Sequence, residues 1–339
     1  GITGDKKYFN WSLSYSKQFA NQIIKSKNDI PVAWDINWNE CFSKDMKTSE
    51  QKFLISNQHH YNNDYFSGIE NLSSSGFIYI FGYLFENSGD EIFFNAAKKV
   101  ITKLFPLLTN PYSDMVGMMF LYYRNKFKDY SFDEAIINLI NKIPADNNYE
   151  LMLGFPEEQK IRIKGIGNRK DMIYWYYLNN LKPKKLNEPP TSFFSLAYNI
   201  TGDLKHVERG FKTAARKIKI ASSLLRTGYE HSDSGKFFSS IISGHGRNWG
   251  VGSVTGCYSP IISGSDENLG VQDYVVKFLS PTLLNGCLPI IRALKNNQFE
   301  LKIYNFSNKK NKIDFLYKKN KEKKSIDIEP NTTIKLILD

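Results

Sequence analysis

The sequence predicts a mainly helical protein that ends in a small antiparallel β-sheet. Three observations support this fold class. Helical periodicity recurs before residue 297, Ser/Thr-Gly-Asp corners separate the helical segments, and apolar residues alternate with polar ones after residue 297. The 339 residues suffice for one large domain with a small appendage, so we expect domains at 1–298 and 299–339. With 41% hydrophobic and 14% aromatic residues, the whole chain is expected to fold.

A short repeat marks three expected helix starts. Thr3, Ser88 and Thr201 each begin a Gly-Asp corner ahead of a helical pattern. Glycine permits the tight turn, and the acid suits the positive N-terminus of a helix. After Ser88 the apolar residues follow one face: Ile92, Phe93, Ala96, Ala97, Val100, Ile101, Leu104 and Phe105. The spacings of 85 and 113 residues between corners are too unequal for a strict solenoid repeat, but each interval can hold several helices, as expected for an (α/α) toroid or an incomplete barrel of helical hairpins.

Further periodic segments fill the intervals. Helical patterns start at Ser113, Ser131, Arg169 and Val271, and the last extends to Asn296. After Asn297, the segments FELKIYNFS, KIDFLYKK, KSIDIEP and TTIKLILD alternate with period two and are separated by polar turns. They predict the small antiparallel sheet that closes the chain.

Charge and motif content narrow the function classes. The net charge of +11 suggests a polyanionic partner, although many lysines after residue 299 lie in expected turns, where solvated side chains explain them. The sequence contains no nucleotide-binding loop, zinc-ligand spacing or serine nucleophile elbow, so we expect neither a cofactor nor a metal, and no nucleic-acid partner. The three widely spaced cysteines are expected to be free or buried.

The chain is also expected to be soluble. No run of eighteen apolar residues predicts membrane insertion, and the N-terminus lacks signal-peptide character. The cellular compartment and the oligomeric state stay open.

The corners, the aromatic helices and the trailing hairpins together resemble the (α/α) toroid carbohydrate-active enzymes, which include glycoside hydrolases and polysaccharide lyases. The resemblance covers roughly residues 1–298 for the toroid and 299–339 for the sheet. It implies a cleft at one end of the barrel, lined by loops, in which sugar rings stack on aromatic side chains. It also implies cleavage by carboxylates in hydrolases, or by Tyr, His, Arg and Asn in lyases.

The segment SGHGRNWGVGSVTGCYSP, residues 243–260, is the first candidate site. Its five glycines disfavour a helix, so we expect a loop. The loop gathers an imidazole, a guanidinium, an amide, an indole and a phenol, from His245, Arg247, Asn248, Trp249 and Tyr258. Such a set suits an acidic sugar, because arginine grips a carboxylate while histidine moves a proton near neutral pH. The alternative is an interhelix loop with Trp249 in the core and Arg247 capping a helix.

Residues 56–70 form the second candidate. Adjacent side chains point apart, so His59 and His60 are not expected to serve one site together. Acid or base roles fall to His60 or Asp64, with Tyr61 or Tyr65 beside them. An Asn-rich surface turn is the alternative.

Three other histidine or acidic positions complete the acid–base candidates. Asp233 could fix the tautomer of His231, or it could cap a helix. His206 lies on a helix rich in lysine and arginine, and we expect it to face solvent.

Two aromatic segments suggest sugar-binding positions. Trp34, Asp35 and Trp38 suit a stacking platform with a hydrogen-bonding carboxylate, and core packing is an equal alternative. Asn168 and Arg169 precede an aromatic helix and are further candidates for substrate binding.

Two mechanisms compete for these residues. A hydrolase needs two carboxyl groups, one of them protonated, and the candidates are Asp35, Asp64 and Asp233. A lyase must neutralise the uronate carboxylate, remove the C5 proton and protonate the leaving oxygen. Arg247 and Asn248 suit the first task, and the others fall to His245, His60 or Tyr258.

The side chains favour β-elimination on an acidic oligo- or polysaccharide. A glycoside hydrolase, and a helical toroid that binds glycan or protein without catalysis, are the alternatives.

Overall fold

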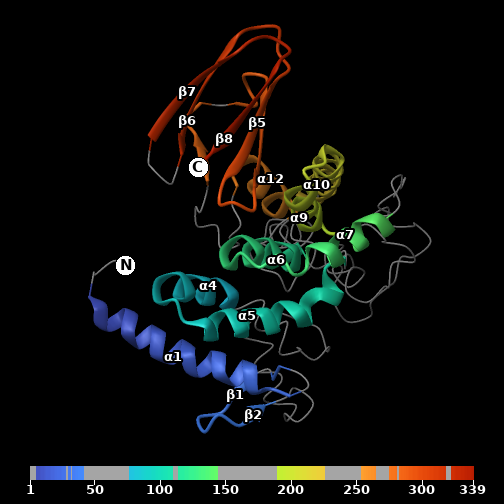
Figure 1. The fold of residues 1–339 in the computed structure, drawn as a ribbon. Coiled ribbons are helices and arrows are strands. Elements are labelled where there is room, and N and C mark those ends of the chain that lie inside the picture. Colours follow the sequence, from blue (N-terminus) through green and yellow to red (C-terminus); the bar gives the residue numbers. More distant parts are fainter. Residues whose placement is uncertain are drawn as a thin grey trace, which may run out of the picture. The chain divides into compact units, whose positions relative to one another are not determined.

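The computed structural model describes residues 5–27, 30–31, 33–41, 76–109, 114–143, 189–225, 253–264, 275–280, 282–317 and 322–339. Within these ranges the protein has eight α-helices and ends in antiparallel strands (Figure 1), which confirms the predicted coarse fold class. The chain divides into two compact units, Gly1–Leu108 with Tyr122–Asp129, and Thr109–Leu121 with Tyr130–Asp339. The predicted domains, 1–298 and 299–339, stay a prediction.

The first unit is built around one central helix. It contains α1 (Lys6–Lys25), the short strands β1 (Ala33–Trp34) and β2 (Glu40–Cys41), α4 (Phe77–Ser88) and α5 (Glu91–Leu104). Both α1 and α4 pack against α5. The side of α1 that is buried carries Ser16, Ala20 and Ile23, and the small side chains among them permit close helix packing.

The second unit contains a group of packed helices. It includes α7 (Asp133–Lys142) and part of α6 (Asp114–Phe127), which is shared with the first unit. Three further helices contact one another: α9 (Thr191–Thr201), α10 (Leu204–Leu225) and α12 (Ser253–Ser263). Their core contains Tyr198, Val207, Ala214, Cys257 and Ile261. The helices predicted from Ser113 and Ser131 are thereby confirmed, and the one predicted from Arg169 lies outside the described residues.

The same corner joins α4 to α5 and α9 to α10. The Ser88 hydroxyl donates to the carbonyl of Leu84 at 2.6 Å and accepts from the backbone N–H of Asp90 at 3.2 Å. Thr201 makes the two equivalent bonds at 2.8 and 3.2 Å. The hydroxyl therefore closes one helix and fixes the residue that caps the next.

Glycine and aspartate complete these corners as the sequence predicts. Gly89 and Gly202 end their helices with φ angles of 69° and 70°, a left-handed conformation that favours glycine. The carboxylates of Asp5, Asp90 and Asp203 each accept a backbone N–H of the following helix, at 2.9, 3.1 and 3.0 Å. All three predicted helix starts are confirmed.

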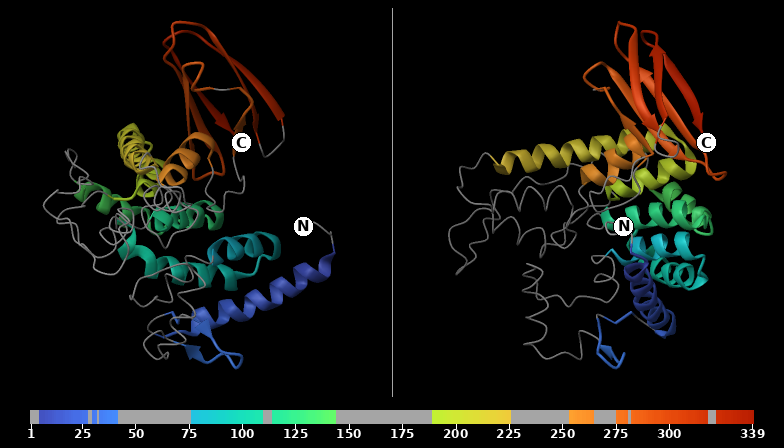
Figure 2. Two further views of the ribbon diagram at one scale, coloured as in Figure 1. Left: turned by 180° about the vertical axis from the view of Figure 1, so that it is seen from behind. Right: turned by 90° about the vertical axis from the view of Figure 1, so that its left-hand side faces the viewer.

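Two three-stranded antiparallel sheets face each other at the C-terminal end of the chain (Figures 1 and 2). One has the order β3 (Val276–Phe278), β6 (Asn311–Tyr317), β7 (Glu322–Ile328), and the other the order β4 (Cys287–Ala293), β5 (Phe299–Asn305), β8 (Thr333–Leu338). They share one apolar core, which includes Ile291, Leu301, Ile303, Ile313, Phe315, Ile328 and Leu338. The strands predicted after Asn297 are confirmed.

The helix predicted over 271–296 is wrong, because this segment supplies β3 and β4. Pro289 lacks the N–H group that a residue in the interior of a helix donates. In the structure it lies in β4, an edge strand, which tolerates proline. Gly286 adopts a φ of 76° just before the strand. All seven residues of β4 pair with β5, and the strand buries five of them.

The loop predicted over 243–260 is wrong for its last part, because α12 begins at Ser253. Cys257 and Ile261, one helical turn apart, are buried against α9 and α10. This packing outweighs the cost of about 1 kcal/mol for Gly256 within a helix. Residues 243–252 lie outside the described residues.

Candidate functional site

Four of the sixteen predicted site residues lie in the described part of the chain: Trp34, Asp35, Trp38 and Tyr258. The other twelve lie outside it: His60, Tyr61, Asp64, Tyr65, Asn168, Arg169, His231, Asp233, His245, Arg247, Asn248 and Trp249. Their roles stay predictions.

Asp35 closes the turn between β1 and β2. Its Oδ1 accepts the backbone N–H groups of Asn37 and Asn39, each at 2.8 Å, and its Oδ2 accepts the amide of Asn39 at 2.8 Å. These bonds, above all the one from the Asn39 side chain, lower the pKa of Asp35. Asp35 is therefore an ionised acceptor that shapes a turn.

The two tryptophans beside this turn pack on α1. The ring of Phe19 meets Trp34 edge-on at 4.7 Å and Trp38 edge-on at 6.4 Å, and it stacks on Phe77 at 4.1 Å. These contacts favour core packing, the second of the two interpretations, for the faces that meet Phe19. Contact of either ring with a sugar stays a prediction.

Tyr258 lies in α12, where its ring packs on Phe211 at a centroid distance of 4.6 Å. Burial raises the pKa of its phenol. The phenol holds its proton at neutral pH, as an ordinary tyrosine does, and the raised pKa makes it a weaker acid, so this shift does not select a catalytic role.

The α1 helix carries exposed aromatic rings that sequence reasoning did not select. Tyr8, Trp11 and Tyr15 are 58%, 69% and 47% exposed. The Trp11 and Tyr15 rings are stacked, with centroids 5.5 Å apart and planes 5° apart. Their spacing of three and then four residues, in a helix with four lysines and no acidic residue, is the signal that could have identified them.

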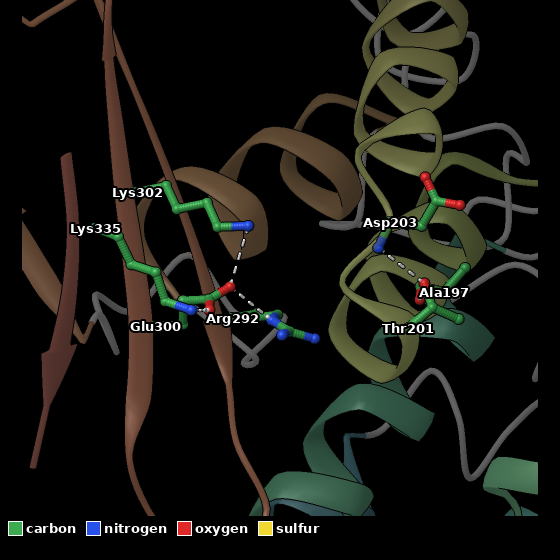
Figure 3. A network of polar contacts seen from close by, with 7 residues as sticks. All are labelled: Ala197, Thr201, Asp203, Arg292, Glu300, Lys302 and Lys335. Atoms are coloured by element: carbon green, nitrogen blue, oxygen red, sulfur yellow. Dashed lines mark hydrogen bonds and ion pairs between the residues drawn. The ribbon is translucent and has the colours of Figure 1, made fainter. Parts of the chain in front are cut away.

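Glu300 on β5 is a buried carboxylate held by three cations. Arg292 Nε, Lys302 Nζ and Lys335 Nζ lie 3.1, 3.3 and 2.5 Å from its oxygens (Figure 3). Burial of the side chain, which is 4% exposed, opposes ionisation, but the bond from Lys335 and the charge of Arg292 lower the pKa of Glu300 to about 2. The carboxylate is thus ionised at neutral pH, and this Glu300 cluster has a net charge of +2.

The Glu300 cluster reaches the corner between α9 and α10. The Arg292 guanidinium points toward this corner (Figure 3), and a Cβ at Gly202 would lie 2.2 Å from Arg292 Nη1. Glycine at this position therefore allows the sheet to approach the helices. The arrangement indicates a structural role for the cluster.

His206 does not face solvent as predicted: it is 6% exposed, on the packed side of α10 with Gly210 and Thr213. Burial lowers the pKa of the imidazole. The abundance of nearby lysines misled the prediction, because it says nothing about which helical face packs. A neutral, enclosed imidazole does not suit proton exchange with a substrate.

No family model matches the chain, and comparison with curated proteins and with solved structures found no match. Among the described residues, no group of three or more His, Cys, Asp or Glu side chains could hold a metal ion. None of the described helices combines the length and apolar character that crossing a membrane requires.

Proposed function

We propose that the protein cleaves an acidic, uronate-containing polysaccharide or oligosaccharide by β-elimination. Arg247 and Asn248 neutralise the sugar carboxylate, His245 or His60 removes the C5 proton, and Tyr258 protonates the leaving oxygen. The helical hairpins belong, in this proposal, to an (α/α) toroid or an incomplete barrel. Its support is the repeated Ser/Thr-Gly-Asp corner followed by antiparallel sheets.

The state of Asp35 is the observation that favours elimination over hydrolysis. A glycoside hydrolase keeps one carboxyl group protonated as the general acid. Asp35 accepts three hydrogen bonds and has a lowered pKa, so it cannot fill this role. Only Asp64 and Asp233 remain as acids for a hydrolase, and both lie outside the described residues, as do all members of the elimination set except Tyr258.

Tyr258 is the member of the elimination set that lies in the described part of the chain. Elimination needs a group that gives a proton to the leaving oxygen, and a phenol can supply it, although burial makes Tyr258 a weaker acid than a free tyrosine. The same ring packs on Phe211, which restricts its position.

Product analysis tests the proposal. The chain is incubated with polygalacturonate, alginate and hyaluronate, and both new reducing ends and ultraviolet absorbance are followed. Elimination leaves an unsaturated sugar, so we expect the two signals to rise together. Reducing ends without absorbance would identify a hydrolase. The absence of both signals would favour a binding protein.

A substitution locates the chemistry. His245→Ala should lower the cleavage rate by about 10²-fold or more if its imidazole transfers a proton. Lys309→Gln, an exposed position in a turn of the sheets, serves as the control. An unchanged rate in His245→Ala removes this residue from the mechanism.

A further inference from the structure

The exposed rings of α1 form a continuous row. Tyr8, Trp11 and Tyr15 are spaced so that they share one side of the helix. The buried residues Ala20 and Ile23 lie about a third of a turn around the helix from this row, and Phe19, one turn after Tyr15, packs on Trp34 and Phe77. The three rings of the row itself stay exposed, so α1 joins its unit through residues beside and beyond them.

Polar and basic side chains border this row. Ser14 and Gln18, both exposed, follow Trp11 by three and seven residues and lie on the same side. Lys7, one turn before Trp11, places its Nζ 5.0 Å from the centre of the Tyr8 ring, and exposed Lys25 extends the same side toward the C-terminus. Lys7 pairs with the capping residue Asp5 at 3.3 Å, but the four lysines of α1 outnumber this one acid, so the helix carries net positive charge.

We propose that the α1 face formed by Tyr8, Trp11 and Tyr15 binds a chain of acidic sugars, as a surface additional to the reaction site. The rings offer flat apolar surfaces to sugar rings, Ser14 and Gln18 offer hydrogen bonds to hydroxyl groups, and the lysines attract carboxylates. Seven residues of helix span about 10 Å, which suits an extended ligand better than a single sugar. The inference rests on the proposed function for its ligand class.

Charge and composition favour a glycan over a lipid surface. A helix that lies in a membrane presents a broad apolar face to it. In α1 the buried side already holds Ala20 and Ile23, and the exposed side alternates aromatic rings with serine and glutamine. Rings that carry hydroxyl and N–H groups amid amide side chains match the mixed character of sugars.

Binding of the full-length chain to polygalacturonate tests this inference, with neutral dextran as the control polymer. In affinity electrophoresis, the double variant Trp11→Ala/Tyr15→Ala should bind polygalacturonate about tenfold more weakly or worse. Tyr83→Ala, which removes a ring that is 52% exposed on α4, should bind as the wild type does. Circular dichroism checks that both variants are folded.

A second pair of variants tests the charge. Lys7→Gln/Lys25→Gln should weaken binding to polygalacturonate and flatten its dependence on salt, because fewer charges are screened. Lys309→Gln should leave both unchanged. Dextran should bind weakly to every variant.

Any of the following results overturns the inference: unchanged affinity of Trp11→Ala/Tyr15→Ala for polygalacturonate, equal affinity for dextran and polygalacturonate, or binding to phosphatidylserine vesicles but not to polygalacturonate. A dimer that dissociates in this double variant also overturns it, since a second copy would then cover the rings. Cleavage of the wild type is scored separately. If binding weakens in Trp11→Ala/Tyr15→Ala but the wild type forms no unsaturated product, the proposed elimination alone is overturned. If the wild type forms an unsaturated product but binding does not weaken in this variant, the α1 inference alone is overturned.

Discussion

Replacing Glu300 by glutamine tests whether the Glu300 cluster stabilises the second unit. The substitution keeps the shape of the side chain and removes its charge. Lys302 and Lys335, which are directly opposite in the register of β5 and β8, then repel each other without a counterion. Arg292 loses the same partner.

The magnitude follows from the pKa of Glu300. The pKa falls from 4.5 to about 2 in the folded protein, which corresponds to about 3 kcal/mol of folding free energy at neutral pH. Because the folded pKa is lowered, this stabilisation is complete above the unfolded value and is lost as the pH falls from about 5 to about 2. Removing one partner of a buried ion pair costs a similar amount, about 3–5 kcal/mol.

Native-state hydrogen exchange of the amides in β4, β5 and β8 provides a local measurement. At pH 7, Glu300→Gln should lower their opening free energy by about 3 kcal/mol, and the difference from the wild type should shrink as the pH falls below about 5. Glu329→Gln is the matched control, because Glu329 forms an ion pair with Lys310 at 3.0 Å but is 63% exposed. It should cost less than about 1 kcal/mol. Equal losses in the two variants, or a Glu300→Gln loss that does not depend on pH, would refute the reasoning.

Two further substitutions test the corner and the sheets. Gly202→Ala should lower the free energy of unfolding in urea more than Gly89→Ala does. Both glycines have positive φ, but a Cβ at Gly202 meets Arg292, whereas a Cβ at Gly89 meets no described atom within 4 Å. Equal costs would contradict the proposed contact. Asn305→Asp should lower the unfolding free energy by about 2 kcal/mol or more, since Asn305 Nδ2 donates to three carbonyls that a carboxylate oxygen would repel. A thermal unfolding midpoint like that of exposed Phe306→Ala would contradict this expectation.

Local chemistry made the helices predictable. A glycine followed by an aspartate encodes a turn and a cap within three residues, so the starts of α1, α5 and α10 could be read from the sequence. The strands after residue 297 could also be predicted, because apolar and polar residues alternate over four segments, and a helix does not produce this period.

Features that depend on tertiary contacts could not be read in this way. Gly286 and Pro289 were signals in the sequence against a helix over 271–296. The apolar run of β4 by itself suits a buried helix or a buried strand, and its pairing with β5 decides between them. The burial of His206 follows from the side on which α10 packs. The exposed ring row on α1 likewise follows from small residues such as Ala20 occupying the packed side.

The candidate site was predicted from residue types that suit one chemistry. That reasoning selected Asp35 for its neighbouring tryptophans, but it could not show that Asn37 and Asn39 would occupy the carboxylate. Hydrogen bonding within a turn thus gives Asp35 a structural role that composition did not indicate, and sugar binding by this segment stays a prediction.

Glu300 also has a consequence for how the strands assemble. Neighbouring residues of β5 point to opposite surfaces of the sheet. A shift of this strand by one residue would therefore turn the Glu300 carboxylate inward, into the apolar core that Leu301 and Ile303 occupy in the correct fold. A misaligned β5 would place both Glu300 and Lys302 in hydrocarbon, while Arg292 on β4 and Lys335 on β8 kept their positions without a counterion. The Glu300 cluster thereby favours the correct strand alignment over one that is shifted by a residue.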